Sequence, residues 1–294
     1  MAWDEAVYFA QGNPTPGNDY DHMIRQAHSM FAEIGYGLDD FFQRMVDGQF
    51  MDLKNREGKA GGGFCTSFDL YGMPYIFANF NGTRGDVEVF THEMGHAFQN
   101  YMSRDQPWVE YLWPTYESCE IHSMGLEFLT WPAMEKFFGQ RADDFRRLHL
   151  ASSLIFLPYG VAVDHFQHLI YENPTASPAE RHTMWQELET QYQPWLDYGD
   201  LPHASQGGRW QSQRHIYASP FYYIDYTLAQ TCALQFWLRA AQDRDQAMKD
   251  YTHLCSLGGQ APFQELVQAA SLVSPFEAGC LSGVVNEARQ WLGI

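Results

Sequence analysis

Two histidines four residues apart, with a glutamate directly after the first, constrain this chain more than any other feature of its sequence. On an α-helix, residues i and i+4 lie on one face, with Cβ atoms about 5–6 Å apart. The rings of His92 and His96 can therefore bind one cation, at roughly 2.0–2.1 Å for zinc. Glu93 lies about 100° around the helix from His92, where its carboxylate can reach a water on that cation. The pattern H-E-x-x-H thus predicts a catalytic zinc site.

The residues around the two histidines predict that their helix is buried. Apolar side chains occupy several sides of this segment, at Val87, Val89, Phe90, Met94, Ala97 and Phe98. A helix that is apolar on several sides is enclosed by protein. Two buried histidines need polar partners, and a metal ion supplies one. The alternative, a surface helix with two solvated histidines, is disfavoured by these flanks.

Charge and hydropathy exclude two classes of partner. The chain has 294 residues, with 36 acidic against 18 basic side chains and a net charge of −18. This balance opposes nucleic-acid binding, because phosphate contacts need clustered lysine and arginine. The longest apolar stretch, Ser152 to Val163, contains Pro158 and is too short to span a bilayer. We therefore expect neither nucleic acid nor a membrane as a partner.

Cysteine usage and the N-terminal residues predict a cytoplasmic location. The five cysteines are widely scattered and form no C-x-x-C pair, which is typical of free thiols in a reducing compartment. The segment Met1 to Glu5 has no basic start followed by an apolar run, so it does not read as a signal peptide.

Local signals predict a mainly α chain with a small antiparallel sheet. The pair Asn18-Asp19 caps a helix that ends at a glycine, and a second amphipathic helix covers residues 38–46. Two short strands, over residues 64–70 and 75–80, are joined by a hairpin-type turn.

The remainder of the chain is predominantly helical. The helix with the two histidines begins around Asp86, and the pair Ser177-Pro178 opens another helix. Residues 193–214 carry glycines, prolines and polar side chains, so we expect a long loop before helices resume near Phe221. The chain contains no repeat and no clear linker, which favours one domain.

A zinc site needs a third protein ligand. The residues that follow His96 supply no third histidine, but the helix predicted over residues 116–129 offers Glu117, Glu120 and Glu127 near one stripe. A solvated acidic face is the alternative. Apolar residues in the same segment indicate that it packs within protein: Ile121, Leu126, Phe128 and Leu129. Buried glutamates at this density predict a cation.

Together these segments resemble the oligoendopeptidase F branch of the thimet oligopeptidase family of zinc metallopeptidases. The resemblance runs from Trp3 almost to the C-terminus and is carried by Arg56–Gly63, Ile76–Thr83, His92–Gln99, Glu117–Phe128 and His215–Tyr226. It implies a zincin-like helical catalytic domain over residues 1–294, one Zn²⁺ ion, oligopeptide substrates and cleavage of internal peptide bonds.

The resemblance also implies roles for individual residues. Glu120 corresponds to the third zinc ligand, and Glu93 corresponds to the catalytic glutamate. Tyr223 and Tyr226 match the tyrosine pair on the substrate side, and His215 matches the active-site histidine. Tyrosines three residues apart share a helical face, and a phenol can donate to the oxyanion of a tetrahedral intermediate. An aromatic stripe in a helical core is the alternative for the two tyrosines.

Two expectations concern the surroundings of the zinc site. Because carboxylates commonly orient zinc-binding histidines, we expect Glu88 or Glu117 to accept the outer N–H of His92 or His96. We expect the strand over residues 75–80 to pair with an extended peptide backbone.

Family members usually carry a large helical lobe before the catalytic half, and this chain begins almost where that half would. We therefore expect the lobe to be absent, and we hypothesise that the missing wall exposes apolar surface and favours homo-oligomers. Two other functions stay open. One is a non-catalytic zinc- and peptide-binding protein, and the other is a zinc carboxypeptidase of related architecture.

Overall fold

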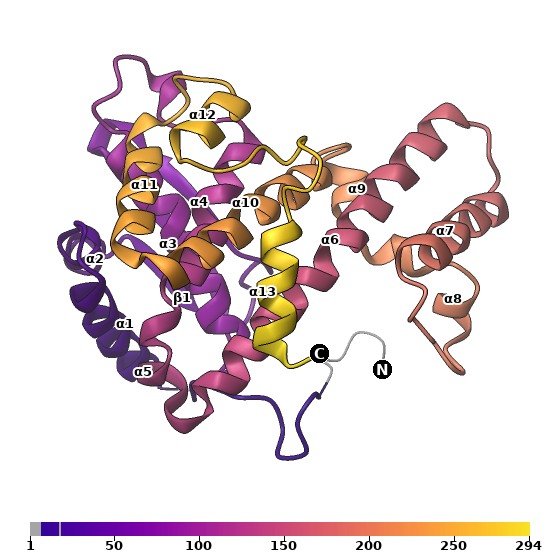
Figure 1. Ribbon diagram of the computed structural model, residues 1–294, viewed down its shortest axis with the longest axis horizontal. Coiled ribbons are helices and arrows are strands. Elements are labelled where there is room, and N and C mark those ends of the chain that lie inside the picture. Colours follow the sequence, from indigo (N-terminus) through magenta and orange to yellow (C-terminus); the bar gives the residue numbers. More distant parts are fainter. Residues whose placement is uncertain (1–6, 18) are drawn as a thin grey trace. The chain divides into compact units, whose positions relative to one another are not determined.

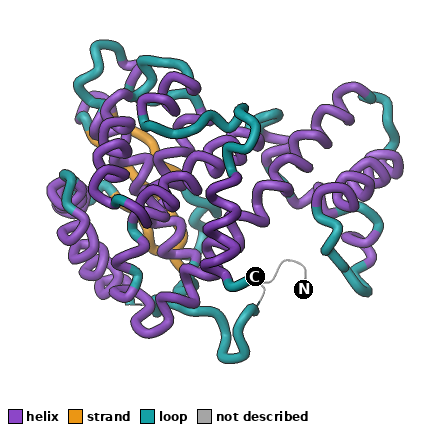
Figure 2. The backbone as a smooth tube through the Cα atoms, in the orientation of Figure 1, coloured by secondary structure: helices purple, strands orange, loops and turns teal. Residues whose placement is uncertain are grey.

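The computed structural model describes residues 7–17 and 19–294, and in these the chain is mainly α-helical, as predicted (Figures 1 and 2). Met1 to Glu5 and Asn18, on which two expectations rest, lie outside the described residues. The contacts divide the chain into a larger unit, Tyr8–Leu150 with Ala229–Ile294, and a smaller unit, Ala151–Leu228. None of the described helices is both long enough and apolar enough to cross a membrane.

The larger unit begins with two helices that pack on each other, α1 (Tyr20–Ile34) and α2 (Leu38–Asp47). Asp19 caps α1, because its side chain accepts the backbone N–H of His22 at 3.0 Å. Gly35 follows the last turn at a φ of 76°, a conformation that favours glycine. Both helices therefore lie where the sequence predicted them.

The sheet has three strands, β1 (Met51–Lys54), β2 (Phe64–Phe68) and β3 (Met73–Phe80), in the order β1-β3-β2. The antiparallel pair of β2 and β3 was predicted from the sequence. Strand β1 was not predicted, and it runs parallel to β3, so the sheet is mixed rather than antiparallel. Four residues are too few to give a clear alternation of apolar and polar side chains.

The central position of β3 corrects a further expectation. Ile76 and Phe77 pair with β1 on one side and with β2 on the other. The prediction that residues 75–80 pair with a substrate peptide is therefore wrong for Tyr75, Ile76 and Phe77, since β2 already pairs with these residues on that side of the strand. In the described part of the chain, the outer edges of the sheet belong to β1 and β2.

Helix α3 (Gly85–Met102) lies in the middle of the larger unit, between β3 and α4 (Tyr116–Leu129) (Figure 1). Its side chains are buried on several sides, as the apolar flanks of its two histidines predicted, although Val89 is exposed. Gly95 permits the close approach of α4, because a Cβ atom there would lie 2.4 Å from the carbonyl oxygen of His122. Residue 95 must therefore be glycine for the two helices to pack in this way.

The C-terminal helices complete the larger unit. Helix α11 (Arg244–Leu257) packs on α3 and α4, and the hydroxyl of Tyr251 donates to the carbonyl oxygen of His122 at 2.8 Å. Shorter helices accompany it: α5 (Glu135–Phe138), α12 (Phe263–Ala269) and α13 (Ser282–Leu292). Two long helices run through both units: α6 (Ala142–Glu172) and α10 (Tyr223–Gln242).

The smaller unit has its own apolar core. Phe166 and Trp185 are fully buried in it, and Trp210 packs against Phe166 with 4.9 Å between ring centroids. Its own helices are α7 (Pro178–Tyr192), α8 (Pro202–Ser205) and α9 (His215–Ala218). The predicted cap of α7 is present as a reciprocal pair of hydrogen bonds between Ser177 and Glu180. The segment expected to be a long loop contains α8 and a short 3-10 turn.

Candidate active site

His92, His96 and Glu120 bring three ligand atoms together between α3 and α4. These atoms lie within 4.8 Å of one another, and Oε2 of Glu120 is 3.3 Å from Nε2 of each histidine. Within the described ranges this is the one group of three or more such side chains close enough to hold a metal ion. The two helices thus bring together the three side chains that were expected from the sequence to bind a metal ion.

The chemistry of these three side chains fits a zinc ion. Two imidazole nitrogens and one carboxylate oxygen form the ligand set of many catalytic zinc sites, which keep a fourth position open. Glu120 is 4% exposed, and burial by itself would raise the pKa of its carboxyl. His96 and His92 outweigh burial and hold that pKa well below its usual range. The hydroxyl of Ser123 donates to the same Oε2 at 2.9 Å and orients the carboxylate.

Glu93 is buried beside this set on α3. It is 6% exposed, and its Oε2 has no hydrogen-bond partner among the described residues. Burial raises the pKa of its carboxyl, against the opposing effect of His92 and His96. A buried carboxylate oxygen is normally paired with a hydrogen-bond donor. Since no protein group in the described part of the chain donates to Oε2 of Glu93, this oxygen is free to accept a proton from a water molecule or a substrate.

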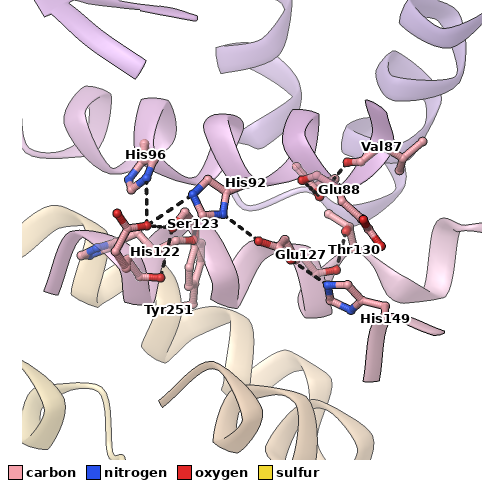
Figure 3. Close-up of polar contacts among 12 residues, drawn as sticks. Val87, Glu88, His92, His96, His122, Ser123, Glu127, Thr130, His149 and Tyr251 are labelled. Atoms are coloured by element: carbon pink, nitrogen blue, oxygen red, sulfur yellow. Dashed lines mark hydrogen bonds and ion pairs between the residues drawn. The ribbon is translucent and has the colours of Figure 1, made fainter. Parts of the chain in front are cut away.

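The outer nitrogen of His92 contacts a glutamate that the sequence did not single out for this role. Oε1 of Glu127 lies 2.7 Å from Nδ1 of His92 (Figure 3). The expected acceptors were Glu88 and Glu117, and for His92 that prediction is wrong, since Glu88 pairs with Arg84 instead. The spacing of seven residues between Glu120 and Glu127 was the available signal, because two helical turns place both side chains on one face of α4.

The other three predicted site residues form a cluster within the smaller unit. The ring of His215 lies 5.2 Å from that of Tyr223 and 5.7 Å from that of Tyr226, between centroids. The two tyrosine rings are 5.5 Å apart. Burial raises the pKa of Tyr223, so its phenol stays protonated. The structure therefore brings the predicted residues together as two groups, each within its own unit.

Two polar residues that the sequence did not mark, Gln213 and Tyr159, are linked to His215 by hydrogen bonds. Gln213 places its amide nitrogen 2.7 Å from Nδ1 of His215, and its amide oxygen accepts the hydroxyl of Tyr159 at 2.7 Å. The guanidinium of Arg209 lies over the Tyr159 ring, 4.9 Å from its centroid. With this amide orientation, Nδ1 of His215 accepts a hydrogen bond, and the proton of the neutral ring is on Nε2. No motif marks Gln213 or Tyr159.

A family model and several solved structures match this chain over most of its length. The model of peptidase family M3 matches residues 35–285. The chain is 50% identical to PZ peptidase A, solved with an inhibitor, with a TM-score of 0.95 over 99% of this chain and 52% of that chain. It is 54% identical to a proposed oligoendopeptidase F, with a TM-score of 0.93 over 97% of this chain and 50% of that chain.

A proposed oligoendopeptidase F from Bacillus anthracis str. Ames is 49% identical, with a TM-score of 0.88 over 100% of this chain and 50% of that chain. The chain therefore spans about half the length of these solved structures. The comparison with curated proteins gave no match.

Proposed function

The chain belongs to peptidase family M3, as its motifs predicted, and from this membership and the geometry of its site we propose that it is a zinc-dependent endopeptidase acting on oligopeptides. One observation carries the proposal: Nε2 of His92 and of His96 converge on one oxygen of Glu120, with the buried Glu93 alongside. We further propose that the chain acts as a single catalytic domain.

Three side chains hold the metal in this proposal. Nε2 of His92, Nε2 of His96 and a carboxylate oxygen of Glu120 would bind one Zn²⁺ ion, whose chemistry when bound is to acidify a water and to polarise a carbonyl. Ser123 fixes the carboxylate of Glu120, and Glu127 fixes the ring of His92. Hydrogen bonds within the protein therefore orient two of the three ligands, Glu120 and His92.

Glu93 serves as the proton carrier. Its unpartnered Oε2 accepts a proton from the attacking water, and the same oxygen later donates that proton to the nitrogen of the leaving amine. Burial supports this role, because it raises the pKa of the carboxyl toward neutral pH. A group whose pKa lies closer to the working pH both accepts and releases protons efficiently.

Tyr226, helped by Tyr223 or His215, donates hydrogen bonds to the oxyanion of the tetrahedral intermediate. Support comes from their mutual ring contacts and from the raised pKa of Tyr223, which keeps the phenolic proton available. A donor placed at such an oxyanion contributes about 3–4 kcal/mol to the stability of the transition state.

An extended peptide would add to the outer edge of β2 rather than to β3. Gly63 directly precedes β2, and a Cβ atom there would lie 3.3 Å from Oε1 of Glu93. The edge of β2 therefore begins next to the proposed proton carrier. Main-chain pairing along a strand edge reads the extended shape of a peptide more than its sequence.

The experiment that tests the proposal is digestion of a mixed oligopeptide library whose C-termini are amidated. We expect mass spectrometry to find internal cleavage products in the presence of zinc and none after chelation. A carboxypeptidase would need the free carboxylate and would leave such peptides intact. A zinc- and peptide-binding protein without activity would bind both partners and yield no product, and this outcome would end the proposal.

A further inference from the structure

Three consecutive hydrogen bonds within the larger unit connect the proposed metal ligand His92 to Trp131. Nδ1 of His92 lies 2.7 Å from Oε1 of Glu127, and Oε2 of Glu127 lies 2.6 Å from Nε2 of His149 (Figure 3). The indole Nε1 of Trp131 then donates to Nδ1 of His149 at 3.0 Å. The line thus joins residues from α3, α4 and α6 with the 3-10 turn that follows α4.

The donor at the far end determines where each proton lies. An indole N–H can only donate, so Nδ1 of His149 is an acceptor, and the proton of its neutral ring is on Nε2. That N–H donates to Glu127, whose other oxygen is left to accept from Nδ1 of His92. With its proton on Nδ1, His92 presents the lone pair of Nε2 toward Glu120, which is the form that binds a metal.

The surroundings hold His149 in one orientation. The residue is 4% exposed, and its ring stacks on Phe145 with 5.8 Å between centroids and 8° between planes. Phe128 packs on it at 4.6 Å, and Trp131 is itself 6% exposed. In this enclosure water cannot readily replace the N–H that His149 gives to Glu127.

We propose that His149 is a positioning residue for the metal centre, which acts through Glu127 to hold His92 in its metal-binding tautomer and orientation. The inference rests on the proposed zinc-dependent function. His149 contacts Glu127 and acts on the metal ligand His92 only through it. If His149 had no N–H, Oε2 of Glu127 would be buried without a hydrogen-bond donor. The carboxylate would then turn to find another donor and lose its alignment with His92. Loss of such outer partners typically weakens metal binding about 10–100-fold.

The test separates hydrogen bonding from packing. His149→Phe keeps an aromatic ring in the stack and removes the N–H, whereas His149→Gln restores an amide donor that can reach Glu127. Zinc affinity of the full chain is measured by competition with a chromophoric chelator, after circular dichroism has shown that each variant is folded. His165→Phe is the matched control, since His165 bonds Tyr192 in the smaller unit.

We expect His149→Phe to weaken zinc binding about 10–100-fold, His149→Gln to recover most of the loss, and His165→Phe to match the parent. Parent affinity in a folded His149→Phe variant, or no recovery in a folded His149→Gln variant, would overturn the inference. If His149→Phe does not fold, a folded Trp131→Phe variant decides, because it keeps an aromatic ring at this position and removes the indole N–H that His149 accepts. A few-fold weaker affinity supports the inference, and unchanged affinity overturns it.

The parent chain keeps the two proposals apart. If the parent binds one zinc ion tightly and the variants bind it equally well, only the role of His149 fails. If the parent binds no zinc, the proposed function fails, and the inference falls with it.

Discussion

The α-carbon of Gly95 faces the carbonyl oxygen of His122 so closely that a Cβ atom on residue 95 would lie 2.4 Å from that oxygen. Gly95 directly precedes the ligand His96, and His122 lies two residues after the ligand Glu120. The approach of α3 to α4 at this point is therefore what brings the imidazoles and the carboxylate to a separation of 3.3 Å.

Gly95→Ala should disturb both folding and metal binding. The added methyl group must push α4 away, since backbone atoms rather than a flexible side chain oppose it. We expect a loss of about 1–3 kcal/mol in the free energy of unfolding and weaker zinc binding. Gly125→Ala is the control on α4, because its Cβ atom would meet Phe236 at 3.5 Å, an ordinary contact. Urea titration of both variants checks this, and equal stabilities would contradict it.

Glu93→Gln should separate metal binding from hydrolysis. The amide keeps the size of the side chain but cannot accept a proton, so we expect hydrolysis to fall at least about 10²–10⁴-fold with the zinc affinity unchanged. Steady-state cleavage of a fluorogenic peptide measures the first quantity, and chelator competition measures the second. Glu88→Gln, on the same helix as Glu93, should leave both nearly unchanged, because Glu88 pairs with Arg84 rather than with a site residue. Activity retained by Glu93→Gln would remove this residue from the mechanism.

Removal of the metal should abolish hydrolysis reversibly and lower the stability of the larger unit. A ligand that binds only the folded chain adds about 2.7 kcal/mol to the free energy of unfolding at a hundredfold excess over its Kd. We therefore expect a lower Tm after dialysis against a chelator and its recovery with one equivalent of zinc. Glu120→Gln should lose most of this zinc-dependent shift, and a variant with the full shift would exclude Glu120 as a ligand.

Gln213→Met should slow hydrolysis without weakening substrate binding. The substitution removes the amide that donates to Nδ1 of His215, so the ring loses the partner that fixes its tautomer. We expect kcat to fall about tenfold with KM little changed, because the His215 ring loses a hydrogen bond that orients it. Gln211→Met, at an exposed position two residues earlier, is the control. An unaltered kcat in a folded Gln213→Met variant would rule out this role.

Lowering the pH should weaken the ion pairs that Asp52 on β1 makes with Arg56 and Lys59, and so lower the free energy of unfolding, over a narrow pH range. The hydrogen bond from Arg56, and then that from Lys59, lower the pKa of Asp52 to about 2. A carboxyl whose pKa is lowered on folding stabilises the protein above its ordinary pKa, and the contribution disappears as pH falls from about 4 to about 2. Asp52 is partly exposed, so we expect at most about 1 kcal/mol. The stabilities of Asp52→Asn and the parent should differ at pH 7 and converge near pH 2.

Much of the site could be predicted because its signals are local. His92, Glu93 and His96 lie within five residues, and helical periodicity alone places both imidazoles on one face. The buried flanks of α3 follow from the apolar residues around them, and the cap at Ser177 follows from the proline directly after it. Glu120 was one of three glutamates on a stripe, and only the resemblance to a family singled it out.

Tertiary structure alone decided the partners of these residues. Glu127 takes the outer nitrogen of His92, His149 joins it from α6, and Gln213 turns toward His215. Helical spacing places Glu127 on the face of Glu120, but no local pattern marks His149 or Gln213. The central position of β3 likewise depends on pairing with β1, which is too short to be recognised by itself. Periodicity and capping report which face of an element is buried. The choice of which buried faces meet depends on packing between residues far apart in the chain, where a single glycine such as Gly95 sets the distance.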